Sequence, residues 1–143
     1  MERHATFWLG WVVLFTAVVA PVEHRIGSGR TIAVFAVGHV GATLLTAVGL
    51  WLALQGDLVE SSVVHAVDVG ASYGFVALAG IATYLLPRRL RWVYLGALLL
   101  ALVVALVLVP SFTDFGYLCA FPIGLACRPL VPAPAPRSES GRG

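Results

Sequence analysis

Long runs of apolar residues, separated by short polar connections, fill most of this 143-residue chain. A helix needs about 20 largely apolar residues to cross the hydrocarbon core of a bilayer. Only 11% of the residues are charged, whereas ordinary soluble domains contain about 25%. The sequence therefore predicts an all-α, polytopic transmembrane bundle of about five spans. The predicted spans are Phe7–Val22, Thr31–Leu54, Val63–Leu86, Trp92–Val109 and Phe112–Cys127.

The connections between these spans differ in charge. Arg25 and Arg30 follow the first span, and three arginines at positions 88, 89 and 91 follow the third. The connection after the second span contains Asp57 and Glu60 but no arginine. Because basic residues are enriched in cytoplasmic connections, this pattern predicts an external N-terminus and a cytoplasmic C-terminus.

The domain expected to fold covers residues 1–128. Residues 129–143 are rich in proline, serine and glycine, which predicts a disordered cytoplasmic tail. The basic residues form no stripe that would indicate nucleic-acid binding. Cys119 and Cys127 have no cysteine or histidine partner at ligand spacing, so we expect neither a metal nor a cofactor.

Ionisable side chains occur inside the predicted spans. His39 lies in the second span, His65 and Asp68 lie in the third, and Asp114 lies at the mouth of the fifth. Ionisable residues are costly in a bilayer, so they usually pair within the bundle or serve a function. One interpretation is structural, with Asp68 and His39 pairing across two helices to fix their register.

The segment "VDVGASYG" in the third span combines small residues with a hydroxyl group. Gly70 and Gly74 are separated by four positions, a spacing that lets membrane helices approach closely. Ser72 between them suggests a second interpretation, because a serine becomes a nucleophile when a base lies within hydrogen-bond reach. Packing and catalysis are therefore both open for this segment.

Three stretches, in this order, resemble the rhomboid superfamily of intramembrane serine proteases. "PVEHRIGSGR" (Pro21–Arg30) resembles the segment after the second core helix of bacterial rhomboids. "VGASYG" (Val69–Gly74) resembles the Gly-x-Ser-Gly nucleophile motif, with a tyrosine inserted before the second glycine. "TDFGYLCAFPIG" (Thr113–Gly124) resembles the last core helix. Together with "GHVGATLLT", these stretches are most similar to a divergent bacterial group described as rhomboid-like.

This resemblance implies a rhomboid-like core that lacks its first helix, or a sequence whose start lies upstream. It places Ser72 at the nucleophile position and Tyr117 at the position of the catalytic histidine. A phenol ionises only near pH 10 and is a poor proton acceptor at neutral pH. The family's oxyanion-stabilising residues would fall near Phe7 and Trp11, which lack the usual donors. Losing one such donor costs on the order of 10²–10³ in rate.

The resemblance also implies that the third span and the last span lie side by side. Ser72 is then expected near Tyr117. Gly70 and Gly74 are expected to let the last helix approach, with Ala120 and Gly124 on its facing stripe. These are the helix-packing residues that the sequence predicts.

The resemblance, with its catalytic histidine position replaced, implies a non-catalytic function. The protein would lie among the lipids of a bacterial plasma membrane and bind the transmembrane segments of single-span clients. One alternative is an intramembrane serine protease that uses Ser72, with His39 or His65 as a relocated base. Another is a small transporter or channel subunit with His39, Asp68 and Asp114 along a polar path, although no inverted repeat supports it.

Overall fold

The structure is a computed structural model that describes residues 2–56, 71–108 and 110–134. These residues form five α-helices and two short 3-10 helices, with no strand among them. The elements are α1 (Glu2–Ile26), α2 (Ser28–Gln55), α3 (Ser72–Ala82), η2 (Thr83–Leu85), α4 (Arg88–Leu108), α5 (Phe112–Ala126) and η3 (Arg128–Leu130). The predicted all-α class is confirmed.

Three of the predicted spans agree with α2, α4 and α5, with ends that differ by four residues or fewer. The first predicted span lies inside α1, which is longer at both ends. The third predicted span begins among residues 57–70, outside the described residues, and continues through α3 and η2. By length and composition, α2 and α4 are able to cross a membrane, and α5 and the α3–η2 segment are shorter apolar helices.

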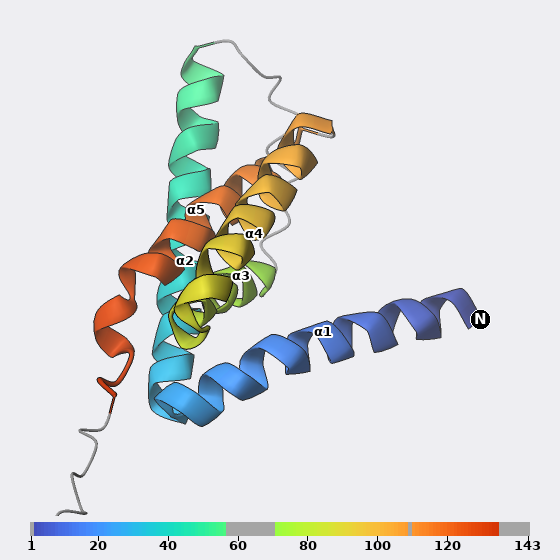
Figure 1. The fold of residues 1–143 in the computed structure, drawn as a ribbon. Coiled ribbons are helices and arrows are strands. Elements are labelled where there is room, and N and C mark those ends of the chain that lie inside the picture. The colour runs from blue at the N-terminus through green and yellow to red at the C-terminus, as the bar shows by residue number, and fades with distance from the viewer. Residues whose placement is uncertain (1, 57–70, 109, 135–143) are drawn as a thin grey trace, which may run out of the picture.

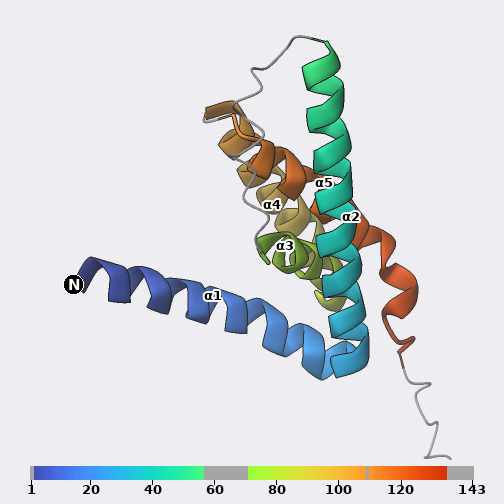
Figure 2. The ribbon, with the colours of Figure 1, turned by 180° about the vertical axis from the view of Figure 1, so that it is seen from behind.

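Helix α3 lies at the centre of the bundle, where it packs against both α2 and α5, which also pack against each other (Figure 1). Helix α4 packs on the outside and has no buried residue. The C-terminal part of α1 contacts α2 and α3, while its N-terminal part projects away from the other helices (Figures 1 and 2). The first helix therefore leaves much of its apolar surface uncovered by the rest of the chain.

Two clusters of buried side chains hold α3 in place. The larger one joins α1, α2 and α3, and its buried members are Val22, Ile26, Val34, Ala77, Leu78 and Ile81. The smaller one joins α2, α3 and α5 through Ala42, Tyr73 and Ala120, all of which are fully buried. Both clusters use the same short helix, so α3 fixes the positions of its neighbours.

Glycines permit the closest approaches to α3. A Cβ atom on Gly38 of α2 would collide with the Ala77 side chain, and a Cβ atom on Gly124 of α5 would collide with the Ala77 carbonyl oxygen. A Cβ atom on Gly80 would lie 2.7 Å from the carbonyl oxygen of Phe121. Small residues at helix contacts let backbones come together without a side chain between them. Ala77 is thus enclosed on two sides by glycine.

The C-terminal end of α3 is closed by side chains from other elements. Leu86 is extended, as expected for the residue before Pro87, and the helical stretch ends there. The last carbonyl groups of a helix lack partners inside it. Arg91 Nε donates to the carbonyl oxygen of Thr83 at 3.2 Å, and its terminal nitrogen donates to that of Tyr84 at 3.3 Å. The Tyr84 hydroxyl donates in turn to the carbonyl oxygen of Leu125 at 2.8 Å.

The packed part of the chain extends slightly beyond the predicted domain boundary at residue 128. Residues 128–130 form η3, and Leu130 and Val131 pack against the larger buried cluster. Their apolar side chains distinguish this short segment from the proline-rich sequence that follows. Residues 135–143 of the predicted tail lie outside the described residues.

Adding one methyl group at the α3–α5 contact should destabilise the protein. Gly124→Ala places a carbon atom against the Ala77 backbone, so we expect a loss of about 1–3 kcal/mol or more, as for overpacked cores. The midpoint of thermal unfolding in dodecylmaltoside micelles measures the effect. Gly96→Ala in α4 is the matched control, because a Cβ atom there meets nothing within 4 Å. Equal midpoints for the two variants would contradict the close contact.

Candidate functional site

The candidate site lies where the N-terminal end of α3 meets α5. Ser72 is the first residue of α3 and is partly buried. Tyr117 on α5 donates a hydrogen bond from its hydroxyl to Ser72 Oγ, with 3.1 Å between the two oxygens. The expected proximity of these side chains is therefore observed. Their assignment as the family's nucleophile and base positions stays a prediction.

The start of α5 is fixed by its own capping residues. The Ser111 hydroxyl accepts a hydrogen bond from the backbone N–H of Asp114 at 3.1 Å and donates to the Asp114 carboxylate at 2.5 Å. A carboxylate in the first turn also interacts favourably with the positive end of the helix dipole. Asp114, which the sequence places at the mouth of a span, thus has a structural role at the helix start. Tyr117 follows one turn later.

Tyr73 fills the space beside the Ser72–Tyr117 hydrogen bond. Its ring is fully buried and meets the Tyr117 ring edge-to-face, with 5.5 Å between centroids. Gly116 makes room for it, because a Cβ atom there would lie 2.5 Å from the Tyr73 ring. The sequence comparison treated Tyr73 only as an insertion in a glycine motif. The signal it missed is the Gly-Tyr pair at 116–117, which provides space and an aromatic partner on the facing helix.

His39 approaches the same site from α2. Its ring lies 6.5 Å from the Tyr73 ring and 6.3 Å from the Phe35 ring, centroid to centroid. Its Nδ1 atom is buried and makes no hydrogen bond within the described residues. His39 makes no hydrogen bond to Ser72 either, although both residues are described. The two side chains are thus separate in this arrangement.

Three of the predicted site residues lie outside the described residues. They are His65, Asp68 and Gly70, all within residues 57–70. The proposed pairing of Asp68 with His39 therefore stays a prediction. The side chains of Phe7 and Trp11, where the oxyanion donors were sought, are also not described. No group of three or more histidine, cysteine, aspartate or glutamate residues that could hold a metal occurs in the described part of the chain.

The predicted packing role of Gly74 requires a correction. We expected Gly74 to face the last helix, but a Cβ atom there would lie 2.6 Å from the ring of Phe35 on α2. On α3, the residues that face α5 are Tyr73, Ala77 and Gly80, which are spaced as one side of a helix. Glycine content alone does not specify a direction, whereas this spacing does.

The other predicted packing residues face α3. Ala120 is fully buried beside Tyr73 in the smaller cluster, and Gly124 contacts the Ala77 backbone. The facing stripe on α5 is therefore correct in position. Its partner on α3 is the Ala77–Gly80 turn rather than Gly74.

The local chemistry consists of two hydroxyl groups inside an aromatic and small-residue environment. The hydrogen-bond partner of Ser72 is the Tyr117 hydroxyl, and no other described side chain is in hydrogen-bond contact with Ser72. Activation of a serine requires a group that removes its proton. Among the described residues, the hydrogen bond to Tyr117 ties the N-terminal end of α3 to α5.

The model of a protein family described as rhomboid-like protein matches residues 2–137. No curated protein and no solved structure matches the chain. The matched range includes all five α-helices and both residues of the Ser72–Tyr117 pair.

The Ser72–Tyr117 hydrogen bond should appear as an energetic coupling. We expect Ser72→Ala and Tyr117→Phe to be non-additive, with a coupling energy of about 0.5–1.5 kcal/mol, as for hydrogen bonds inside proteins. The unfolding free energies of the wild type, both single variants and the double variant in micelles measure it. Strictly additive losses would show that the two hydroxyls do not interact.

Proposed function

The chain belongs to the rhomboid-like family, and from that premise we propose that it binds the transmembrane segments of client proteins without cleaving them. Family membership and the apolar helices α2 and α4 make it a membrane protein of the rhomboid type. The proposal concerns what such a protein does when the usual catalytic base is replaced.

The observation that carries the proposal is that the partner of Ser72 is the phenol of Tyr117, with 3.1 Å between the two oxygens. A phenol ionises only near pH 10, so at neutral pH this partner is protonated and is a poor acceptor for the serine proton. A general base must instead accept the proton of the attacking hydroxyl. This supports an inert serine that serves as a hydrogen-bond partner between α3 and α5.

Binding surface is available on the helices that the bundle does not enclose. Leu9, Val12 and Val13 of α1 are each at least 60% exposed, and Trp92 and Val93 of α4 are each 69% exposed. Transmembrane helices associate through van der Waals packing and interhelical hydrogen bonds. The projecting half of α1 (Figure 2) and the exposed side chains of α4 therefore offer apolar surface against which a client helix can pack.

The second candidate is an intramembrane serine protease with a relocated base. The observation that favours it is the buried, unbonded Nδ1 atom of His39, beside the residue that follows Ser72. In that case a movement of α2 against α3 would bring His39 to Ser72. Activity measurements separate the two functions.

The purified wild-type protein should be inert toward serine-directed probes. We expect no labelling by a fluorophosphonate and no cleavage of a model transmembrane substrate, because the hydrogen-bond partner of Ser72 among the described residues is a phenol, which is a poor base. Tyr117→His should restore little activity if the oxyanion donors are also absent. Labelling of the wild type that disappears in Ser72→Ala would overturn the proposal. If labelling also disappears in the separate variant His39→Gln, His39 is the base.

Client binding should survive the loss of the serine. A photo-crosslinking amino acid at Val13 should capture single-span membrane proteins in cells, and Ser72→Ala should leave their yield unchanged. Ile32 of α2 provides a control position with the same 66% exposure. A captured segment, synthesised and reconstituted with the purified protein, should crosslink from Val13 but not from Ile32. Equal crosslinking from both positions would indicate unspecific contact in the membrane.

We also propose a bacterial plasma-membrane location, with the N-terminus outside and the C-terminus in the cytoplasm. The arginines at the α1–α2 and α3–α4 connections support this orientation. A reporter fused after Arg142 should report a cytoplasmic location, and a reporter inserted near Asp57 should report an external one. The reverse pattern of reporter activity would refute the orientation.

A further inference from the structure

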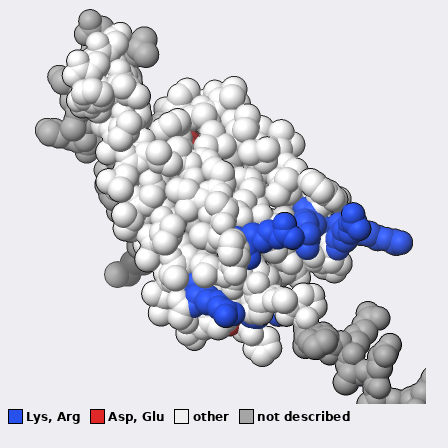
Figure 3. Space-filling view, turned by 90° about the vertical axis from the view of Figure 1, so that its left-hand side faces the viewer, with Lys and Arg blue, Asp and Glu red and all other residues white. Residues whose placement is uncertain are grey.

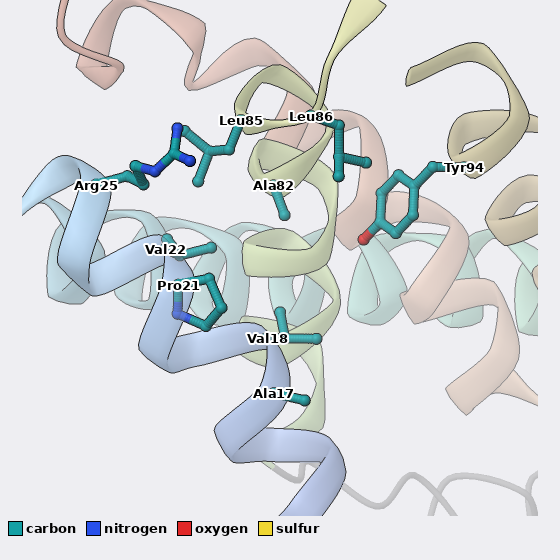
Figure 4. A pocket seen from close by; sticks show the side chains of 9 residues that line it. All are labelled: Ala17, Val18, Pro21, Val22, Arg25, Ala82, Leu85, Leu86 and Tyr94. Atoms are coloured by element: carbon teal, nitrogen blue, oxygen red, sulfur yellow. The ribbon is translucent and has the colours of Figure 1, made fainter. Parts of the chain in front are cut away.

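An apolar pocket lies between α1 and α4, over the C-terminal part of α3 (Figure 4). Its volume is about 280 Å³, close to the lower end of the range for small-molecule sites, about 300 Å³. The lining residues are Ala17, Val18, Pro21, Val22, Arg25, Ala82, Leu85, Leu86 and Tyr94. All except Arg25 and Tyr94 are aliphatic. The hydroxyl of Tyr94 already donates to the carbonyl oxygen of Ala79 at 2.7 Å, so the ring forms an apolar wall.

Arg25 is the one charged residue in this lining. In Figure 4 its side chain reaches toward Leu85 at one end of the pocket, while Ala17 and Val18 lie at the other end. Eight residues of helix separate Ala17 from Arg25, or about 12 Å along the axis. The pocket thus has an apolar length and one cationic end.

The guanidinium group of Arg25 is available for a ligand. Arg25 is exposed and makes no hydrogen bond or ion pair with any described residue. Arg91, by contrast, is engaged by the carbonyl groups at the end of α3. The carboxylate of Glu23, two positions earlier in α1, accepts a hydrogen bond from Ser28 at 2.6 Å and makes no ion pair with Arg25.

The surroundings of Arg25 are strongly basic. The end of α1, the start of α2, the end of α3 and the start of α4 lie toward the same end of the bundle (Figure 1). Arginines gather toward one end of the face seen in Figure 3, where little acidic surface is visible. The arginines of these helix ends are Arg25, Arg30, Arg88, Arg89 and Arg91. This end therefore attracts anions at a membrane surface.

We propose that the pocket binds one anionic phospholipid, with its phosphate at Arg25 and an acyl chain along the apolar lining. A soluble anion would use the arginine but not the pocket. A zwitterionic lipid would use the pocket but gain less from the surrounding arginines. A client helix is too wide to fit into this small cavity and would pack on the projecting half of α1 instead. The combination of an apolar slot and a cationic end fits an anionic lipid.

Native mass spectrometry of the full chain tests this proposal. The protein is released from dodecylmaltoside micelles that contain equal amounts of palmitoyl-oleoyl phosphatidylglycerol and phosphatidylcholine. We expect one retained phosphatidylglycerol, and Arg25→Gln should lower its occupancy about fivefold, the typical contribution of one arginine near an anionic surface. Arg30→Gln is the matched control, because it removes the same charge at the same end without lining the pocket.

A second pair of variants tests the acyl-chain position. Ala17→Phe fills the pocket from its exposed wall and should reduce phosphatidylglycerol retention. Thr16→Phe adds the same ring at the preceding exposed residue, outside the lining, and should leave retention unchanged. Circular dichroism verifies that each variant keeps its helical content.

Three results would overturn the lipid site. Equal losses in Arg25→Gln and Arg30→Gln would indicate general attraction to the basic end. Equal retention of phosphatidylcholine would remove the role of charge. Unchanged retention in Ala17→Phe would place the lipid elsewhere. Client crosslinking from Val13 is measured separately, so failure of the lipid site leaves the proposed function intact.

Discussion

The contact of Ala77 with Gly38 on one side and Gly124 on the other is the constraint on which the rest of the bundle depends. In a membrane the hydrophobic effect does not drive helices together, because lipid is as apolar as a helix surface. Close packing of backbones must supply the attraction. The backbones of α2 and α5 come this close to α3 because these two positions carry no side chain. This contact brings both α2 and α5 onto α3, and these two helices also pack against each other.

The position of α3 along its own axis follows from the same contact. Tyr73 enters the space left by Gly116, and the Ser72 hydroxyl then meets Tyr117. At the other end, Arg91 and Tyr84 satisfy backbone carbonyl groups and tie α3 to α4 and α5. Both ends of the central helix are therefore held by polar contacts, while its middle is held by packing.

This division leaves the outer helices free for other molecules. Helix α4 buries no residue within the bundle. Helix α1 contacts α2 and α3 only through its C-terminal part. Uncovered apolar surface at the periphery fits the proposal of a protein that binds helices and lipids. The proposed lipid pocket lies where α1 and α4 both reach α3, so a bound lipid would stabilise the junction from which α1 projects.

The sequence alone determined the helical class, most helix boundaries and the proximity of Ser72 to Tyr117, because hydropathy is a local property and the three motifs occur in family order. It also placed Asp114 at the mouth of the last span, where the structure shows its carboxylate and Ser111 capping the start of α5. The tertiary structure alone decided which glycine faces which helix: Gly74 faces α2, and Ala77 with Gly80 faces α5. Small residues permit close approach on any side, and only the rotation of a helix among its neighbours selects one.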